Sequence, residues 1–454
     1  MVDAGDFAWK SAGLPSVRLP QQRRKAELQL AAFAKGGIDA LAPGDGDLAL
    51  GPTWLQDAAR VAGVPLVLAN VRCEGSAPFA PAAVVERGGV KSVIAGVMAE
   101  RSRMPEGCVV GRPAPALQSV LDAVGPVDLV IVLSHQDPQD DAALASAIPA
   151  ADIFVNAGSG ASLSQPRALP GAAVQLAAGS RGKKLGVATI TLRGDAEGFE
   201  TEGARQALAA RLDRMRARLA TARAQVDAAG DGGKKKRAER RVAHFSDEVG
   251  RLEAELEVVL ASGTQPRNAI STVLRGLTDA VADDPEVAAM LEAAKVEIDA
   301  AARTAARTAI GTDEAQGRQP EAGAEPAAAY AGSQACAGCH PGPMAQWKPT
   351  PHATAWSSLV EVNRQMDLDC WTCHATGAGQ LGGPQHPTEV TPELAGVGCE
   401  SCHGAGAAHA RSPMEHGLVG KPGLDVCTAC HDGEQDGGRF DPETYVPAVV
   451  HTGP

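Results

Sequence analysis

Eight of the ten cysteines in this 454-residue chain belong to four copies of one motif, Cys-x-x-Cys-His. The cysteine pairs are Cys336/Cys339, Cys370/Cys373, Cys399/Cys402 and Cys427/Cys430, followed by His340, His374, His403 and His431. Two thiols at this spacing can form thioethers with the vinyl groups of a haem, and the adjacent imidazole can reach the iron as proximal ligand. Zinc sites and redox dithiols also use Cys-x-x-Cys, but neither requires a histidine after every pair. The motifs therefore predict four covalent c-type haems.

A second set of histidines could coordinate the opposite side of each iron. Nine of the eleven histidines follow residue 335, and those outside the motifs are His352, His386, His409, His416 and His451. Six residues of extended chain reach only about 20 Å, so we expect His409 to coordinate a neighbouring haem and not its own. A surface position or a contact with a haem propionate is the alternative for each of the five. Thioether ligation by Met344, Met366 or Met414 would raise a haem potential, although packing is the favoured interpretation of these methionines.

The order of these motifs and the residues around them resemble the tetrahaem cytochrome c-554 family. The resemblance covers about residues 333–454 and is carried by CAGCH, WKPTPHATAW, CWTCHATG, GVGCESCHGAGAAHA and CTACH. It implies closely packed haems that transfer electrons, most with two histidine ligands, and allows one five-coordinate iron. By position, His352 and His409 match the distal ligands of the family, whereas His386, His416 and His451 map less cleanly. We expect a mostly irregular segment with a few short helices, whose core is largely porphyrin.

The first two hundred residues have a different pattern. Short apolar runs at residues 64–71, 90–97, 127–134, 151–158 and 184–192 are rich in β-branched residues and bounded by Gly or Pro, which predicts buried strands. Helical stretches, such as residues 21–37 and 115–125, lie between them. This alternation predicts an α/β layered domain over residues 1–200.

Four sequence blocks in this domain resemble the calcineurin-like metallophosphatase domain of bacterial nucleotidases. They are VDAGD, IDALAPGDGDLALG, VIVLSHQD and DIFVNAGSGA, which correspond to the GD, GNHEFDxG, LSH and GHSH blocks. The resemblance implies a two-metal centre that activates water against a phosphate ester. Asp6 and His135 stand where ligands belong, and Asp45 replaces an asparagine. Glycine replaces the expected histidines at Gly46, Gly158 and Gly160. We therefore expect only a weak residual site at Asp6, Asp45 and His135, no bound divalent metal and no phosphohydrolase activity.

The middle of the chain is predicted to be helical over residues 201–310. Apolar residues at heptad spacing in residues 208–226 and 242–256, with glycines between, predict an antiparallel coiled-coil hairpin. A third helix is expected from a cap at Asp284, with Pro285 at its first position, to about Ile310. Residues 311–332 have the composition of a linker, and the multihaem domain is expected over residues 333–454.

Charge and hydropathy restrict the partners. The net charge of −12 argues against nucleic-acid binding, and no run of about 20 apolar residues predicts a transmembrane segment. Neither a secretory signal nor the D-x-H strand of the phosphatase family precedes VDAGD. We interpret this as an N-terminal truncation of a protein that is naturally exported or periplasmic. Cys73 and Cys108 could form a disulfide or remain as two inert thiols.

These observations favour an electron-transfer protein over an enzyme. The hypothesis is an exported multihaem cytochrome with unidentified redox partners and an inactive nucleotidase-like scaffold. The first alternative is a reductase that acts on a small substrate, such as a nitrogen oxide, at an open haem iron. The second is a metal-dependent phosphohydrolase with an attached redox module.

Overall fold

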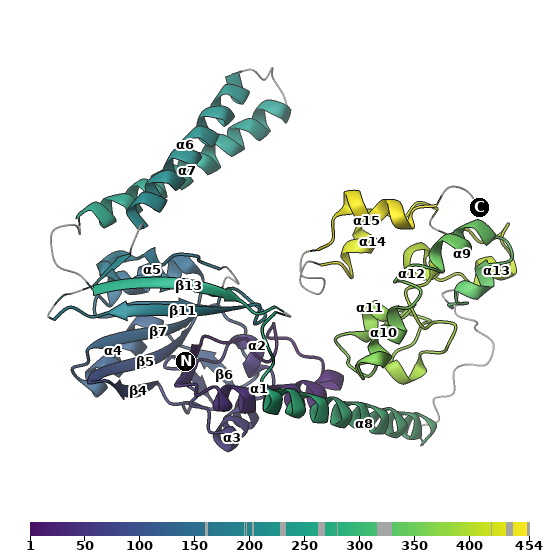
Figure 1. Ribbon diagram of the computed structural model, residues 1–454, viewed down its shortest axis with the longest axis horizontal. Coiled ribbons are helices and arrows are strands. Elements are labelled where there is room, and N and C mark those ends of the chain that lie inside the picture. The colour runs from purple at the N-terminus through teal and green to yellow at the C-terminus, as the bar shows by residue number, and fades with distance from the viewer. Residues whose placement is uncertain are drawn as a thin grey trace. The chain divides into compact units, whose positions relative to one another are not determined.

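The computed structural model describes residues 1–158, 162–194, 196, 198–201, 204–227, 233–261, 268–278, 280–315, 329–418, 420–432 and 439–451 (Figure 1). The chain divides into two compact units, Met1–Asp284 and Pro285–Pro454. This division falls inside the segment 201–310, which the sequence pattern had grouped together. The third predicted helix therefore belongs to the second unit.

A six-stranded sheet forms the centre of the first unit. Its order is β4 (Ala82–Arg87), β5 (Val90–Met98), β7 (Leu129–His135), β8 (Ile153–Asn156), β10 (Val174–Leu176) and β9 (Arg167–Ala168). Figure 1 shows β4, β5 and β7 side by side. The four central strands are parallel, and each edge strand is antiparallel to its neighbour. Helices α4 (Pro113–Val124) and α5 (Pro138–Ala147) lie in the connections between parallel strands. The predicted α/β layered fold is confirmed.

The central strands are buried because both faces of the sheet are covered. On one face, Val97 and Val132 pack with Leu117 of α4 and Leu144 of α5. On the other face, Ile94 and Leu133 pack against a second cluster that includes Ala40 and Val67. Two covered faces explain why these strands read as continuous apolar runs instead of alternating ones.

Two of the five predicted buried strands differ from the structure. Residues 64–71 form only isolated bridges at Leu66 and Val67, before β3 (Val71–Cys73) begins. Residues 184–192 do form a strand, β11 (Lys184–Thr191), but most of it is exposed. It lies at the edge of a separate three-stranded sheet, so the prediction of burial was wrong.

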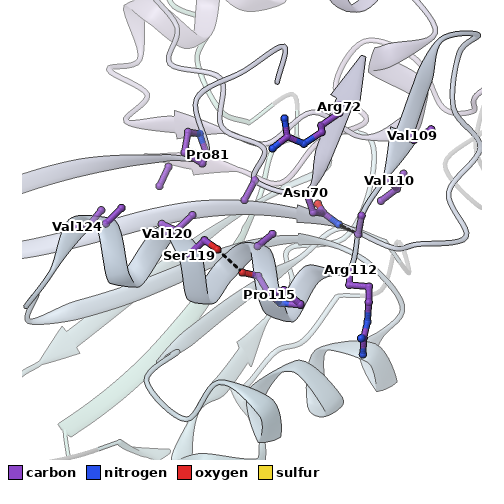
Figure 2. A pocket seen from close by; sticks show the side chains of 15 residues that line it. Asn70, Arg72, Pro81, Val109, Val110, Arg112, Pro115, Ser119, Val120 and Val124 are labelled. Carbon is purple, nitrogen blue, oxygen red and sulfur yellow. Dashed lines mark hydrogen bonds between the residues drawn. The ribbon is translucent and has the colours of Figure 1, made fainter. Parts of the chain in front are cut away.

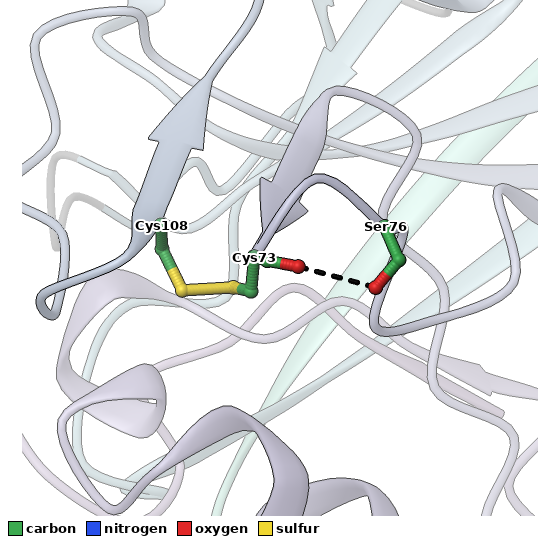
Figure 3. The surroundings of a disulfide bond; sticks show 3 residues. All are labelled: Cys73, Ser76 and Cys108. Carbon is green, nitrogen blue, oxygen red and sulfur yellow. Dashed lines mark hydrogen bonds between the residues drawn. A yellow bond between two sulfur atoms is a disulfide. The ribbon is translucent and has the colours of Figure 1, made fainter.

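The remaining elements at the N-terminus surround a small parallel pair. This pair joins β1 (Val2–Asp3) to β2 (Ala40–Leu41). The helical elements are η1 (Ser16–Arg18), α1 (Leu19–Lys35), α2 (Asp45–Leu48) and α3 (Pro52–Ala62), and η2 (Pro170–Ala172) lies farther along the chain. Strand β3 pairs with β6 (Cys108–Val110), and Cys73 and Cys108 form a disulfide between them (Figure 3). The choice that the sequence left open is therefore resolved in favour of the disulfide.

Two long helices, α6 (Ala204–Asp227) and α7 (Gly233–Ala261), pack along an apolar seam. Leu212, Leu219 and Leu252 are buried in this seam. Ion pairs connect the two helices beside it: Arg211 lies 2.9 Å from Glu248, and Arg216 lies 2.7 Å from Glu253.

The sequence pattern missed a strand in the segment that it assigned to helices. Strand β13 (Asn268–Gly276) pairs antiparallel with β11 along eight residues and parallel with β12 (Phe199–Thr201). Its sequence, NAISTVLRG, mixes polar and apolar residues because much of the strand is exposed. Residues 201–310 are therefore not wholly helical.

The second unit consists of one long helix and several short ones. Helix α8 (Pro285–Ala315) begins at the predicted proline and extends past Ile310. Residues 329–451, here called the motif segment, contain η3 (Ser333–Cys336), α9 (Pro341–Trp347), α10 (Ala355–Glu361), α11 (Trp371–His374), η4 (Pro387–Glu389), α12 (Cys399–His403), α13 (Ala407–Arg411), α14 (Leu424–Thr428) and α15 (Pro442–Val449). Within the described parts of the chain, no helix is both long and apolar enough to cross a membrane.

Candidate functional site

Single helical turns position the four Cys-x-x-Cys-His motifs. Helix α12 contains the whole third motif, and α11 contains the end of the second. In the first motif the N–H of His340 donates to the carbonyl of Cys336 over 2.9 Å, and His431 makes the same bond to Cys427 in the fourth. Residues i, i+3 and i+4 of a helical turn lie on one face. Each motif can therefore present two sulfurs and one imidazole to the same porphyrin.

Cysteines of different motifs also meet. The thiols of Cys336 and Cys399 share a hydrogen bond, and so do those of Cys373 and Cys430. These thiols stand in for the thioether sulfurs of a haem-loaded chain, which mark the porphyrin edges. The contacts thus bring the first motif close to the third and the second motif close to the fourth.

One predicted attachment residue, Cys339, differs from the others. It is exposed, whereas the other seven motif cysteines are partly buried. The cause is local: η3 ends at Cys336, and Cys339 lies in the turn that follows this short helix. Its part in haem attachment stays a prediction from the spacing of the first motif.

Three motif histidines face a second imidazole. The ring centroids are 6.4 Å apart for His340 and His409, 6.2 Å for His352 and His431, and 5.7 Å for His403 and His451. A metal bonded to both rings through bonds of about 2 Å, the length that zinc–imidazole bonds have, separates the centroids by about 6 Å. The spacing of each pair suits an iron between the two rings.

Hydrogen bonds at Nδ1 orient two of these imidazoles. Nδ1 of His409 lies 2.6 Å from the carbonyl oxygen of His416, and Nδ1 of His374 lies 2.7 Å from that of Ala355. A carbonyl can only accept, so Nδ1 must carry the proton in both rings. The lone pair of Nε2 is then available to a metal, which is the arrangement that metal-binding histidines usually have.

The other candidate ligands have different surroundings. His386 caps η4, where its Nδ1 accepts from the backbone N–H of Thr388 and lies 2.8 Å from the hydroxyl of that residue. His416 contributes its backbone carbonyl to His409. Among the described residues, no second imidazole ring packs against His374. The structure therefore brings three of the five candidates, His352, His409 and His451, to a motif histidine, and the assignment of iron ligands stays a prediction.

The N-terminal unit brings Asp6, Asp45 and His135 together. Nε2 of His135 lies 3.4 Å from Oδ2 of Asp6 and 3.6 Å from Oδ1 of Asp45. One ligand atom from each residue falls within 4.8 Å of the others, a spacing that could hold one metal ion. Asp6 follows β1, Asp45 begins α2 and His135 ends β7.

Burial and the contacts among these three residues set the direction in which each pKa shifts. Burial raises the pKa of Asp6, whereas a hydrogen bond with His135 lowers the pKa of Asp45. Burial acts to lower the pKa of His135, but the hydrogen bond to Asp45 and the charges of nearby carboxylates outweigh it, so the pKa is raised. When it is protonated, His135 neutralises part of the acidic charge of Asp6 and Asp45.

Sequence reasoning missed the residue that shapes the loop carrying Asp6. Asp47 is fully buried, and its carboxylate accepts the backbone N–H groups of Asp6 at 2.8 Å, Ala8 at 2.9 Å and Gly44 at 2.9 Å. Burial raises the pKa of Asp47 to about 7. Asp6 itself has a φ of 56°, which is uncommon for a residue with a side chain. The second aspartate of the sequence GDGD, residues 44–47, was the feature that could have indicated this role.

The chain backbone occupies two positions where the phosphatase family has histidine. A Cβ on Gly46 would lie 2.0 Å from the carbonyl oxygen of Trp9, and one on Gly158 would lie 2.2 Å from that of Gln136. No side chain fits at either position without moving the backbone. Gly160, the third such position, lies outside the described residues.

An apolar groove of about 500 Å³ lies elsewhere in this unit, beside α4 and the β3–β6 pair (Figure 2). Asn70, Arg72, Val109, Arg112 and Val120 are among the residues that line it. Asp6, Asp45 and His135 do not line it. The groove is therefore separate from the three residues that could hold a metal ion.

The motif segment is similar to known cytochromes. Residues 335–404 match the family model described as cytochrome c554 and c-prime. Cytochrome c-554 of Nitrosomonas europaea is 34% identical over 137 residues, which cover 23% of this chain and 58% of the relative. The chain therefore spans less than two thirds of that relative's length. The resemblance expected for the C-terminal part of the chain is confirmed.

The N-terminal unit is similar to solved phosphoesterases. A 5'-nucleotidase precursor from Thermus thermophilus is 21% identical with a TM-score of 0.36, covering 55% of this chain and 49% of that chain. A calcineurin-like phosphoesterase from Bacillus subtilis is 18% identical with a TM-score of 0.36, covering 43% of this chain and 72% of that chain. At these low values the likeness says nothing about activity.

We predict that restoring a histidine at position 46 does not restore phosphatase chemistry. Gly46→His should destabilise the N-terminal unit by about 1–3 kcal/mol or more, because overpacking forces the backbone to move. Thermal unfolding should show this loss, and p-nitrophenyl phosphate should not be hydrolysed with manganese or zinc supplied. Gly13→His is the matched control, because a Cβ at Gly13 meets nothing within 4 Å. Unchanged stability of the Gly46 variant, or metal-dependent turnover, would contradict the closed site.

A second prediction separates His409 from His416. In haem-loaded protein, His409→Ala should convert one haem in four from low-spin to high-spin, because it removes the imidazole that faces His340. His416→Ala should leave the spectrum of the parent protein unchanged, because His416 contacts His409 through its backbone carbonyl, which alanine retains. Optical spectra of the ferric proteins measure both outcomes. A high-spin fraction larger than that of the parent from His416→Ala, or no increase over the parent from His409→Ala, would show that the pairing is wrong.

Proposed function

We propose that this protein is an exported c-type cytochrome that carries electrons through four covalently bound haems. The observation that carries the proposal is the placement of four Cys-x-x-Cys-His motifs in one compact unit, where three motif histidines face a second imidazole. An iron with an imidazole on each side has no open position for a substrate. Such irons exchange electrons without binding a reactant, which favours electron transfer over catalysis.

Contacts between motifs support passage of electrons along the segment. The sulfurs of the first and third motifs meet, as do those of the second and fourth. Porphyrins attached at these sulfurs would have neighbouring edges. Two close pairs within one unit give a compact carrier, and soluble redox proteins that donate and accept single electrons are the partners that this arrangement suits.

Export is supported by the disulfide between Cys73 and Cys108. Disulfides persist in oxidising compartments such as the bacterial periplasm and are rare in reducing cytosol. Covalent haem attachment to Cys-x-x-Cys-His agrees with the same compartment. The proposed location is therefore periplasmic or otherwise outside the cytoplasm.

The N-terminal unit serves as a scaffold in this proposal. Its Asp6, Asp45 and His135 could hold one ion, but backbone atoms fill the positions of two histidines that the two-metal reaction needs. The strands persist because they bury apolar side chains. This steric closure disfavours a phosphohydrolase with an attached redox module.

One observation favours a reductase as a second candidate function. The ring of His374 faces no second imidazole among the described residues, although its Nδ1 is fixed by Ala355 in the orientation that suits a proximal ligand. An iron bound by His374 alone would keep an open position. A small ligand such as a nitrogen oxide could coordinate there.

The test of the proposed function is the number of haems. Protein made with a periplasmic haem-attachment system should have an intact mass that exceeds the polypeptide mass by four haem groups. Replacing both Cys427 and Cys430 with serine should reduce the excess to three, and protein made without the attachment system is the control for the bare chain. An excess of three or fewer in the unmodified protein would contradict the proposal.

A further inference from the structure

One buried carboxylate of the motif segment has no role in haem attachment. Glu400 lies between Cys399 and Cys402 of the third motif and is only 3% exposed. Charged residues are almost never buried to this degree without a partner. Among the described residues, however, no lysine, arginine or histidine forms an ion pair with Glu400.

Backbone N–H groups surround this carboxylate. Oε1 accepts from Ala331 at 2.9 Å and from Gly406 at 2.6 Å, while Oε2 accepts from Gly332 at 2.7 Å. Both oxygens act as acceptors, which is the pattern of an ionised carboxylate. Glycine at 406 permits the close approach, since a Cβ there would lie 3.1 Å from Oε1.

The charge of Glu400 extends to its neighbours. Burial raises the pKa of Tyr330, and the negative charge of Glu400 raises it further. Cys399, the residue next to Glu400, shares its hydrogen bond with Cys336 of the first motif. The carboxylate therefore lies inside the third motif and close to the first, and the structure shows no such buried carboxylate within the second or fourth motif.

A buried charge costs desolvation energy, and three neutral donors do not cancel its field. Oxidation of a haem adds one positive charge at the iron. A fixed negative charge nearby stabilises the ferric state relative to the ferrous state, most strongly where water is excluded. Charge and burial around a haem are established means of setting its reduction potential.

We propose that Glu400 sets haem potentials: its buried charge lowers the potential of the haem of the third motif and, to a smaller extent, that of the first. This inference rests on the proposed multihaem function. With haems bound, an electron that passes from the haem of the first or third motif to the haem of the second or fourth motif would leave the donor iron ferric and the acceptor iron ferrous. Glu400 thus biases electrons toward the haems of the second and fourth motifs.

The test compares two substitutions at this position in the full-length, haem-loaded protein. Glu400→Gln keeps the shape and removes the charge, whereas Glu400→Asp keeps the charge. Redox titration followed by electron paramagnetic resonance should show a positive midpoint shift of one or two low-spin signals in Glu400→Gln and parent midpoints in Glu400→Asp. Glu393→Gln is the matched control, because Glu393 is an exposed carboxylate seven residues before Glu400.

The shifted signal can be assigned through the imidazole that faces His403. Combining Glu400→Gln with His451→Ala should remove the most strongly shifted signal from the low-spin set. If Glu400→Gln fails to fold, Tyr330→Lys offers a second route, because a cation next to Glu400 offsets its charge and should raise the same midpoint.

Several outcomes would overturn the inference. They are unchanged midpoints in Glu400→Gln or in Tyr330→Lys with four haems attached, equal shifts in the Gln and Asp variants, or an equal shift in Glu393→Gln. Equal shifts at position 400 would mean that the side chain acts only by holding the loops around the third motif. A haem count below four in the unmodified protein would instead contradict the proposed function and leave the charge effect without its haem.

Discussion

Three pairs of imidazole rings bring together parts of the motif segment that are distant in sequence, and the apolar core of this segment is small. Its apolar cluster consists of Leu368, Trp371, Ala375 and Ala378 with few neighbours, which is little buried surface for more than a hundred residues. The ring pairs of His340 with His409, His352 with His431 and His403 with His451 instead bring together turns and short helices that are distant in sequence. A metal between each pair would supply the connections that side-chain packing does not.

In each unit a buried carboxylate accepts hydrogen bonds from several backbone N–H groups, and the consequence differs between the two units. In the N-terminal unit, Asp47 gathers the N–H groups of the loop around Asp6 and Gly44, and the neighbouring chain closes the space beside Gly46. The result is a compact loop without room for a catalytic histidine. In the motif segment, Glu400 gathers Ala331, Gly332 and Gly406 around the third motif. There the carboxylate leaves a negative charge where a haem would be attached.

Much of this arrangement could be predicted from the sequence where spacing determines geometry. The Cys-x-x-Cys-His motifs and the strands at β5, β7 and β8 follow from local patterns, whereas the convergence of Asp6 with His135 was implied by the resemblance to calcineurin-like metallophosphatases. The prediction failed where tertiary context decides. An exposed edge strand such as β11 has the same apolar run as a buried one, and β13 mixes polar and apolar residues because much of the strand is exposed. The strand predicted at residues 64–71 forms only isolated bridges at Leu66 and Val67, and the apolar run there does not distinguish these bridges from a regular strand.

The histidines show the same limit. Sequence could name five candidates to face the motif histidines, but it could not separate His451, which meets His403, from His386, which caps a short helix. His416 contacts His409 through its backbone carbonyl, and Glu400 is buried. Both features depend on how distant segments fold together, which the sequence pattern does not show.

The central claim is that three motif histidines share an iron with a second imidazole while His374 does not. Spin quantification of the oxidised, haem-loaded protein by electron paramagnetic resonance tests it most directly. The account predicts three low-spin haems and one high-spin haem, whereas four low-spin haems, or more than one high-spin haem, would contradict it.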